Sequence, residues 1–342
     1  MKSNVSNILN WYYQNKRDLS WRKVNDPFYV WISEIMLQQT RIEAVIDYYE
    51  RFLKEIPTVE VLANIEEEKL LKLWEGLGYY NRARNLKKSA QIIMKDYQGN
   101  FPNTYEELLT LPGIGEYTAS AISSICFQEK KAVIDGNVLR IFTRFYNDNS
   151  NISQNSTKQK VKQELEKILP KEAGDFNEAL MEIGETICIP NGMPLCDICP
   201  LKNNCLAKKN QNYFDFPVKS EKKKKKELYY TVFIYRYQDQ IAIRKRKEKT
   251  ILNNLWEFPN EEEKFKIQDV KHYLQEQKIS YRKIQKWIDS SHTFTHQVWH
   301  MTSYLIDLDD KLECSEYIFE KVDVIKEKYA IPSVFQPFLM KL

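Results

Sequence analysis

The spacing of hydrophobic residues predicts helices in the N-terminal part of the chain. Val138, Ile141, Phe142 and Phe145 lie at helical offsets and form one apolar stripe. Few segments before residue 218 alternate apolar and polar residues with a period of two, which is the pattern of a half-buried strand. The sequence therefore predicts an all-α domain over residues 1–218.

A different pattern begins after residue 227. Segments rich in β-branched and aromatic residues predict strands over residues 229–237, 240–246 and 300–308. Helical spacing returns near residues 267–277 and 316–328. The second domain, residues 228–342, is therefore predicted to be α+β.

A run of like charge separates the two patterns. The chain has 51 Lys and Arg against 47 Asp and Glu, but residues 219–227 (KSEKKKKKE) alone hold six basic and two acidic residues. Like charges repel one another and oppose folding, so this stretch is predicted to be a solvated linker between the domains. An electrostatic clamp on nucleic acid is the alternative for the same lysines.

Composition indicates a folded protein of two domains. The chain has 342 residues, 43% of them hydrophobic and 13% aromatic, which excludes global disorder. The first twenty residues lack a secretory signal pattern, and no uncharged stretch approaches the roughly 18 residues of a membrane span. We therefore expect a cytoplasmic protein without membrane contact.

Four of the six cysteines are crowded into one short segment. Four thiolates within 18 residues suit one tetrahedral zinc ion or one cubane iron–sulfur cluster, and fit a disulfide framework poorly. The two isolated cysteines, Cys126 and Cys314, are expected to be core residues. The crowded cysteines are Cys188, Cys196, Cys199 and Cys205.

Three further features carry candidate chemistry. Gly113 and Gly115, in LPGIGEYTASAI, allow a tight turn whose bare backbone N–H groups could approach a phosphate, although such a loop is also an ordinary helix connection. Asp26 and Pro27 predict the start of a helix on which the carboxyl group of Glu34 lies among apolar residues. Asp135 directly precedes the helix of the apolar stripe.

The chain resembles a known enzyme family, the adenine-specific DNA glycosylases of the MutY type within the endonuclease III superfamily, which act on adenine mispaired with guanine or 8-oxoguanine. The resemblance implies an all-α helix-hairpin-helix DNA glycosylase domain with a [4Fe-4S] cluster in the loop 188–205, followed by an α+β Nudix-like domain. Besides the cysteines, it rests on DLSWRK (18–23), SEIMLQQTRIEAVIDYYERF (33–52), WEGLGYYNRARNL (74–86), LPGIGEYTA (111–119), VIDGNVLRIFTR (133–144), LWEFP (255–259) and HTFTH (292–296).

The resemblance implies roles for the two carboxyl groups in hydrolysis of the adenine N-glycosidic bond. Glu34 would be the general acid that protonates adenine N7, its proton retained by desolvation. Asp135, beside Asn137, would stay ionised through backbone N–H contacts and stabilise the oxocarbenium-like sugar. The alternatives are an exposed Glu34 and an Asp135 that only caps its helix.

Tyr117 separates two activities within the superfamily. The bifunctional relatives, which also cut the DNA backbone, have at this position a lysine that attacks the sugar. A phenol cannot form that Schiff base, so the resemblance implies a monofunctional enzyme in which Tyr117 helps to shield the cationic sugar. Tyr117 could alternatively be a core aromatic residue.

The remaining implied contacts concern the DNA. The extruded adenine would be surrounded by Trp21, Arg22, Leu37 and Glu178. Gln39 and Tyr79 would fill the gap that the base leaves, although Tyr79 could equally be a packing residue. In the second domain the REXXEE segment of working Nudix enzymes is absent, and the 8-oxoguanine loop Phe-Ser-His of the family is here Phe294, Thr295, His296. A surface His296 and a core Phe294 are the alternatives.

We therefore predict a monomeric, monofunctional adenine DNA glycosylase that acts in base excision repair on double-stranded DNA with A:8-oxoguanine or A:G mispairs. One alternative is an endonuclease III-like bifunctional glycosylase and lyase, which Tyr117 opposes. The other is a non-catalytic DNA-binding scaffold, which Glu34 and Asp135 oppose.

Overall fold

The structure is a computed structural model that describes residues 1–221, 224–247, 251–312 and 314–342. The chain forms two compact units. Unit 1 comprises Met1–Asn64 and Asn85–Glu221, and unit 2 comprises Ile65–Arg84 and Lys222–Leu342. Within the described ranges, every helix is too short or too polar to cross a membrane.

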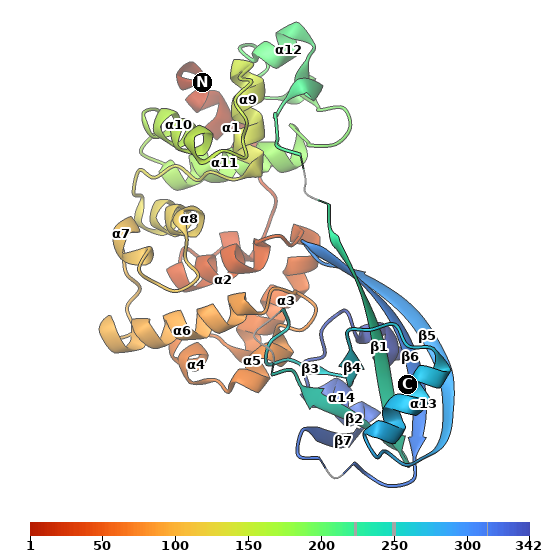
Figure 1. The fold of residues 1–342 in the computed structure, drawn as a ribbon. Helices are drawn as coiled ribbons and strands as arrows, with labels where there is room; N and C mark the ends of the chain where they lie inside the picture. Colours follow the sequence, from red (N-terminus) through yellow and green to blue (C-terminus); the bar gives the residue numbers. More distant parts are fainter. Residues whose placement is uncertain (222–223, 248–250, 313) are drawn as a thin grey trace. The chain divides into compact units, whose positions relative to one another are not determined.

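Unit 1 is helical, as the hydrophobic pattern predicts, and all of it is described (Figure 1). Asp26 caps one of its helices by accepting a 2.8 Å hydrogen bond from the Phe28 N–H, and Pro27 is the first helical residue. The helices are α1 (Val5–Asn15), α2 (Pro27–Leu37), α3 (Ile42–Glu55), α4 (Val59–Asn64), α6 (Asn81–Asp96, whose first turn belongs to unit 2), α7 (Tyr105–Leu108), α8 (Glu116–Phe127), α9 (Gly136–Tyr146), α10 (Asn155–Glu166), α11 (Ala173–Thr186) and α12 (Leu206–Asn210).

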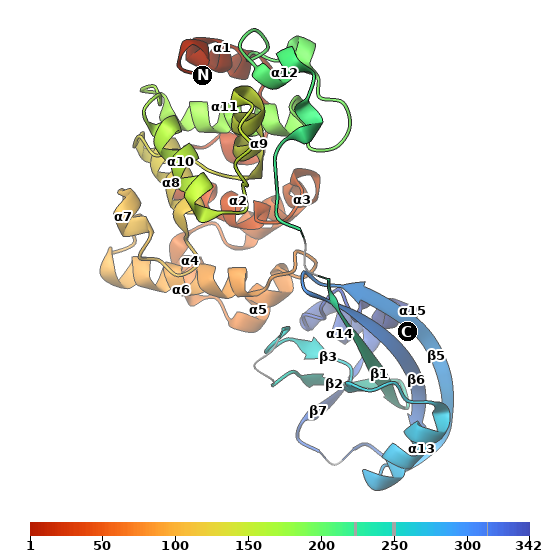
Figure 2. The same cartoon turned by 45° about the horizontal axis from the view of Figure 1, so that its top comes forward.

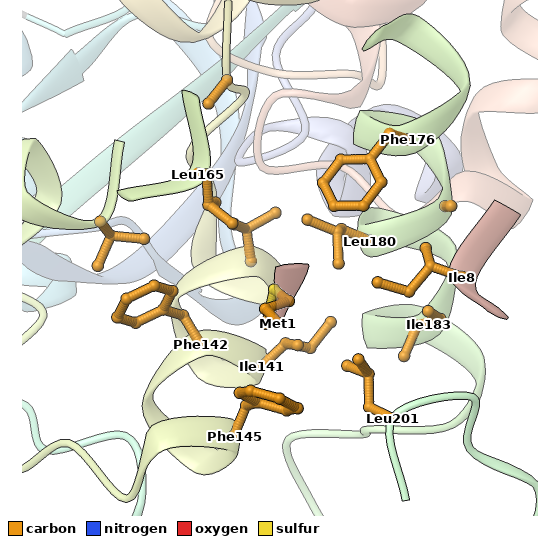
Figure 3. Packing of buried hydrophobic residues seen from close by; sticks show 14 of the residues in the cluster. Met1, Ile8, Ile141, Phe142, Phe145, Leu165, Phe176, Leu180, Ile183 and Leu201 are labelled. Atoms are coloured by element: carbon orange, nitrogen blue, oxygen red, sulfur yellow. The ribbon is translucent and has the colours of Figure 1, made fainter. Parts of the chain in front are cut away.

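A large hydrophobic core joins α1, α9 and α11 (Figure 3). The predicted stripe on α9 is buried, which confirms the helical pattern: Phe142 and Phe145 face the same cluster as Ile8 of α1 and Ile183 of α11. Burial of this much apolar surface is the main term that holds the three helices together. The core therefore fixes α9, at whose N-terminus Asp135 lies, against α11.

Unit 2 contains a mixed sheet. The strand order is β3-β2-β1-β6-β5, in which β1 and β6 are parallel; β4 and β7 pair with β1 and β2, respectively. The strands are β1 (Lys226–Tyr237), β2 (Gln240–Lys245), β3 (Trp256–Glu257), β4 (Asn260–Glu261), β5 (Tyr281–Thr293), β6 (Gln297–Leu308) and β7 (Tyr317–Lys321). Figure 2 shows β5 and β6 as a long curved hairpin.

The predictions for this unit are confirmed in part. The three predicted strands correspond to β1, β2 and β6, and the first predicted helix to α13 (Ile267–Glu276). The prediction of a helix over 316–328 is wrong for its first half: residues 317–321 form β7 because Ile318 pairs with Ile243 of β2, and only α14 (Val322–Lys328) is helical. Strand β5 was not predicted.

Alternating residues of β1 separate the two faces of the sheet. Phe233 and Tyr235 pack with α13, whereas Val232 and Ile234 pack with α14 and with α15 (Gln336–Lys341). Since successive side chains of a strand point to opposite faces, a strand covered on both faces is apolar at nearly every position. This explains the continuous apolar run in β1.

The segment Ile65–Arg84, which includes α5 (Glu67–Leu73), packs with the sheet although it lies within the predicted helical domain. Glu68 accepts a 2.9 Å hydrogen bond from Trp256 Nε1 and also pairs with Lys245. Glu75 accepts a 2.8 Å hydrogen bond from the Ile331 N–H. Two carboxylates of this segment thus bind the C-terminal part of unit 2.

Candidate active site

The carboxyl group of Glu34 is buried in unit 1. Glu34 lies on α2 with 6% of its surface exposed, and its Oε2 has no hydrogen-bond partner in the part of the chain that is described. Desolvation raises the pKa of Glu34 to about 7, although interaction with the Tyr117 hydroxyl acts in the opposite direction. The alternative of an exposed Glu34 is therefore wrong, and this group can hold a proton near neutral pH.

Asp135 is the N-cap of α9. Its Oδ1 accepts a 2.7 Å hydrogen bond from the Val138 N–H, and its Oδ2 accepts a 3.0 Å bond from Asn137 Nδ2. Burial raises the pKa of Asp135, whereas its contacts with the Val138 N–H, Asn137 and Arg140 lower it by a smaller amount. The carboxyl group both caps the helix and belongs to the buried acidic cluster.

Tyr117, in the first turn of α8, interacts with both of these carboxyl groups. Its hydroxyl is 3.5 Å from Met181 Sδ. Burial raises the pKa of Tyr117 well above its usual value, and the charges of Glu34, Asp135 and Glu178 raise it further. The phenol therefore stays protonated beside the acids, and the structure brings Glu34, Tyr117 and Asp135 together from three helices.

A pocket in unit 1 is lined by four of the predicted site residues, Trp21, Arg22, Glu34 and Glu178. Arg22 Nε lies 3.0 Å from Glu178 Oε1. The Tyr12 hydroxyl donates a 2.8 Å hydrogen bond to Glu178 Oε2. Because both oxygens of Glu178 have a partner, its carboxylate is held in one orientation in the pocket wall. Leu37, at the end of α2, is not among the residues that line this pocket.

Sequence reasoning missed the ion-pair network that supports this pocket. Glu182 is fully buried and accepts hydrogen bonds from Arg17 Nε at 2.6 Å and Arg22 Nη2 at 2.9 Å. Burial would raise the pKa of Glu182, but its bonds to the two arginines outweigh burial and lower it. The i, i+4 spacing of Glu178 and Glu182 on α11, with two arginines near residue 20, was a signal that could have found it.

The glycine motif forms the turn that precedes α8. Gly113 has a φ of 81°, and a Cβ there would lie 2.7 Å from Asn85 Cβ, so only glycine fits without a shift. Gly115 is the N-cap of α8, and nothing lies within 4 Å of where its Cβ would be. The first N–H groups of a helix have no partner within the helix, so this open end can accept an anion.

Both predicted wedge residues have a left-handed backbone. Gln39, directly after the C-cap of α2, has a φ of 58° and is exposed. Tyr79, in unit 2, has a φ of 47°, and half of its surface is exposed. Residues other than glycine seldom adopt such angles, and those that do cluster at functional sites. An exposed Tyr79 disagrees with the alternative of a packing residue.

The loop Phe294, Thr295 and His296 forms the tip of the β5–β6 hairpin. Phe294 is partly buried, and the centre of its ring lies 5.0 Å from that of the Trp299 ring. This agrees with the alternative prediction that Phe294 is a core residue. Thr295 and His296 are exposed. Thr295 Oγ1 lies 2.8 Å from the Tyr79 hydroxyl, so the structure brings two predicted DNA contacts together within unit 2.

The four crowded cysteines line one pocket at the end of α11. Arg144 Nη1 lies 3.3 Å from Cys188 Sγ. Among the described residues, no three Cys, His, Asp or Glu side chains are arranged to bind a single metal ion. Cys314 is exposed, so its prediction as a core residue is wrong; it lies on the surface before β7.

Known proteins resemble both parts of the chain. Residues 32–171 match the HhH-GPD superfamily of base excision DNA repair proteins, and residues 230–341 match the NUDIX domain. An adenine DNA glycosylase of Buchnera aphidicola subsp. Schizaphis graminum is 38% identical over 304 residues, 88% of this chain and 86% of that protein. That of Rattus norvegicus is 42% identical over 215 residues, 59% of this chain and 41% of its own.

Solved structures agree with the sequence relatives. The structure of a thermostable thymine-DNA glycosylase matches with a TM-score of 0.56 and 29% identity, and the match covers 61% of this chain and 96% of that one. The helical fold is thus that of a helix-hairpin-helix glycosylase, followed by a Nudix-like domain. With a relative this similar along most of both lengths, and with both domains in the same order, the chain belongs to the adenine DNA glycosylase family.

Proposed function

We propose that this protein hydrolyses the N-glycosidic bond of adenine mispaired with 8-oxoguanine or guanine in double-stranded DNA, as a monomer. The observation that carries the proposal is Glu34, a buried acid with an unpartnered Oε2 and a pKa of about 7, in a pocket that Arg22 and Glu178 also line. A general acid is most effective when its pKa lies near the working pH.

The reaction needs two proton transfers and one new bond between the sugar and water. Glu34 gives its proton to N7 of the extruded adenine, the glycosidic bond breaks, and its electron pair leaves with the base. The sugar becomes cationic at C1′, where the carboxylate of Asp135 and the oxygen of Tyr117 oppose the charge. Water adds to C1′ and its proton passes to a carboxylate, which leaves free adenine and an abasic site.

The substrate is held by contacts outside the reacting centre. Arg22 and Glu178 offer a fixed donor and acceptor to the edge of adenine, and Trp21 offers an apolar face. The N–H groups after Gly113 and Gly115 bind a phosphate, and Gln39 and Tyr79 fill the gap in the stack. Thr295 and His296 bind 8-oxoguanine on the other strand. The threonine hydroxyl supplies the donor and acceptor that a serine would.

A [4Fe-4S] cluster fits the donor set of the cysteine pocket, which Cys188, Cys196, Cys199 and Cys205 line. These four thiolates would hold the cluster, and the iron–thiolate bonds would cross-link the loop 188–205 to the end of α11. A 2.9 Å hydrogen bond from the Leu195 N–H to the Ile187 carbonyl closes the first part of this loop.

The test is adenine release from duplexes with adenine opposite 8-oxoguanine, guanine or thymine, followed by alkali to cut abasic sites. We expect release from the first two duplexes and no strand cut before alkali. Strand cleavage without alkali, through an adduct that borohydride traps, would favour the bifunctional alternative. Binding without any release would favour the scaffold.

A further inference from the structure

Lys225 and Lys226, the last lysines of the charged linker, are hydrogen-bonded to the tip of the β5–β6 hairpin. The backbone N–H of Lys226 donates a 3.0 Å hydrogen bond to the His296 carbonyl, and the Nζ of Lys225 donates a 2.8 Å bond to the Phe294 carbonyl. Parallel pairing of β1 with β6 begins here, with Lys226 opposite Gln297. Figure 1 shows β1 starting beside this hairpin tip. These lysines therefore have a fixed place in unit 2.

Their charge is uncompensated. Lys224, Lys225 and Lys226 are all exposed, and no carboxylate of the described residues lies within ion-pair distance of them. The adjacent acid, Glu227, is paired with His300 at 2.5 Å. The partner of Lys225 is a neutral carbonyl, and an ammonium group has three donors, so Lys225 keeps its charge and two donors for another ligand.

We propose that Lys224, Lys225 and Lys226 bind phosphates of the strand that carries the 8-oxoguanine, beside that base. The inference rests on the proposed function, in which Thr295 and His296 contact the oxidised base. Lys225 and Lys226 are bonded to the backbone of that loop, and Lys224 directly precedes them, so they reach the adjoining phosphates without ordering a free linker, which lowers the entropic cost of binding. The excess positive charge of the chain would then attract the DNA backbone beside the 8-oxoguanine. The same phosphate contacts would orient the loop that contains Thr295 and His296.

The first experiment replaces all three lysines. Binding of Lys224→Gln/Lys225→Gln/Lys226→Gln to a duplex with 8-oxoguanine opposite a non-hydrolysable adenosine analogue is measured at several salt concentrations. Removal of one lysine–phosphate pair reduces the slope of log Kd against log salt by about 0.9, so we expect a reduction of about 2 to 3. The matched control, Lys326→Gln/Lys328→Gln/Lys341→Gln, removes the same charge from exposed positions on α14 and α15 and should keep the wild-type slope. Lys225→Arg, which retains charge and donor, should also keep it.

The second experiment locates the binding site on the DNA. Single methylphosphonates, which are uncharged, replace in turn the phosphates next to 8-oxoguanine or those next to the adenine analogue. Wild-type protein should bind more weakly when phosphates near 8-oxoguanine are replaced, and the affinity of the triple variant should not fall further there. An unchanged salt slope in the triple variant, or an effect confined to the adenine strand, would overturn the inference.

The two proposals fail in different ways. If wild-type protein releases no adenine, the proposed function fails whatever the salt slope is. If wild-type protein releases adenine and the triple variant keeps its slope, only phosphate binding by the lysines is rejected.

Discussion

The hydroxyl group of Tyr79 lies 2.8 Å from Oγ1 of Thr295, so a residue proposed to enter the base stack is bonded to one proposed to bind 8-oxoguanine. Both residues belong to unit 2, because the segment Ile65–Arg84 packs with the sheet. Insertion of the wedge and binding of the oxidised base are therefore expected to be energetically coupled.

This coupling is measurable by a double-mutant cycle. Tyr79→Phe and Thr295→Val each remove one hydroxyl and keep the approximate shape of the side chain. We expect a coupling free energy of about 0.5–1 kcal/mol in the affinity for the A:8-oxoguanine duplex, as for a partly exposed hydrogen bond. Strict additivity of the two substitutions would show that the bond contributes nothing to recognition.

Glu34→Gln should abolish most of the chemistry while DNA binding persists. Loss of a positioned proton donor lowers the single-turnover rate by roughly 10²- to 10⁴-fold. In the wild type, release should slow as the pH rises through about 7, since the protonated form of Glu34 disappears there. The control is Glu60→Gln on the exposed face of α4, which should keep both rate and pH profile. A flat wild-type profile between pH 5 and 9 would argue against Glu34 as the acid.

The ionised carboxyl group of Glu34 is expected to lower the free energy of unfolding. Desolvation raises its pKa from 4.5 to about 7 on folding, so the folded protein binds an extra proton between these values. Unfolding free energy should therefore fall as the pH rises from 4.5 to 7, with the full penalty, on the order of 3 kcal/mol, above 7. Glu34→Gln should raise the unfolding free energy at pH 8 more than at pH 5. Denaturant unfolding at both values tests this, and equal effects would contradict it.

The contribution of Glu182 to the unfolding free energy has the opposite pH dependence to that of Glu34. Its bonds to Arg17 and Arg22 lower its pKa despite burial, so its contribution is present above the unfolded value and is lost as the pH falls through the folded one. Glu182→Gln removes the buried negative charge that pairs with Arg17 and Arg22. It should therefore destabilise the protein by roughly 3–5 kcal/mol at pH 7. Glu164→Gln, which breaks a surface pair with Lys167, serves as the control and should have little effect.

The cysteine pocket predicts the composition of the metal site. Anaerobically purified protein should contain about four iron and four sulfide per chain. Cys199→Ala should lose both, whereas Cys314→Ala, at an exposed position outside the pocket, should retain them. One zinc per chain without sulfide would reject the cluster.

Local features of the molecule were predictable because they depend on neighbours in the chain. The cap at Asp26, the apolar stripe on α9, the turn at Gly113 and the crowding of the cysteines follow from residue type and spacing. The same holds for the phenol of Tyr117, whose inability to form a Schiff base is a matter of its own chemistry.

Other features depend on what packs against a residue from far along the chain. Strand β5 is half exposed and mixed in composition, so only its pairing with β6 defines it, and β7 became a strand through β2. Burial of Glu34, the raised pKa of Asp135 and the fixed place of Lys225 are likewise set by groups that folding brings near. The sequence by itself determined which chemical groups this protein carries and where its helices begin. Only the tertiary structure decided their protonation and partners, because desolvation and non-local hydrogen bonds arise when distant segments meet.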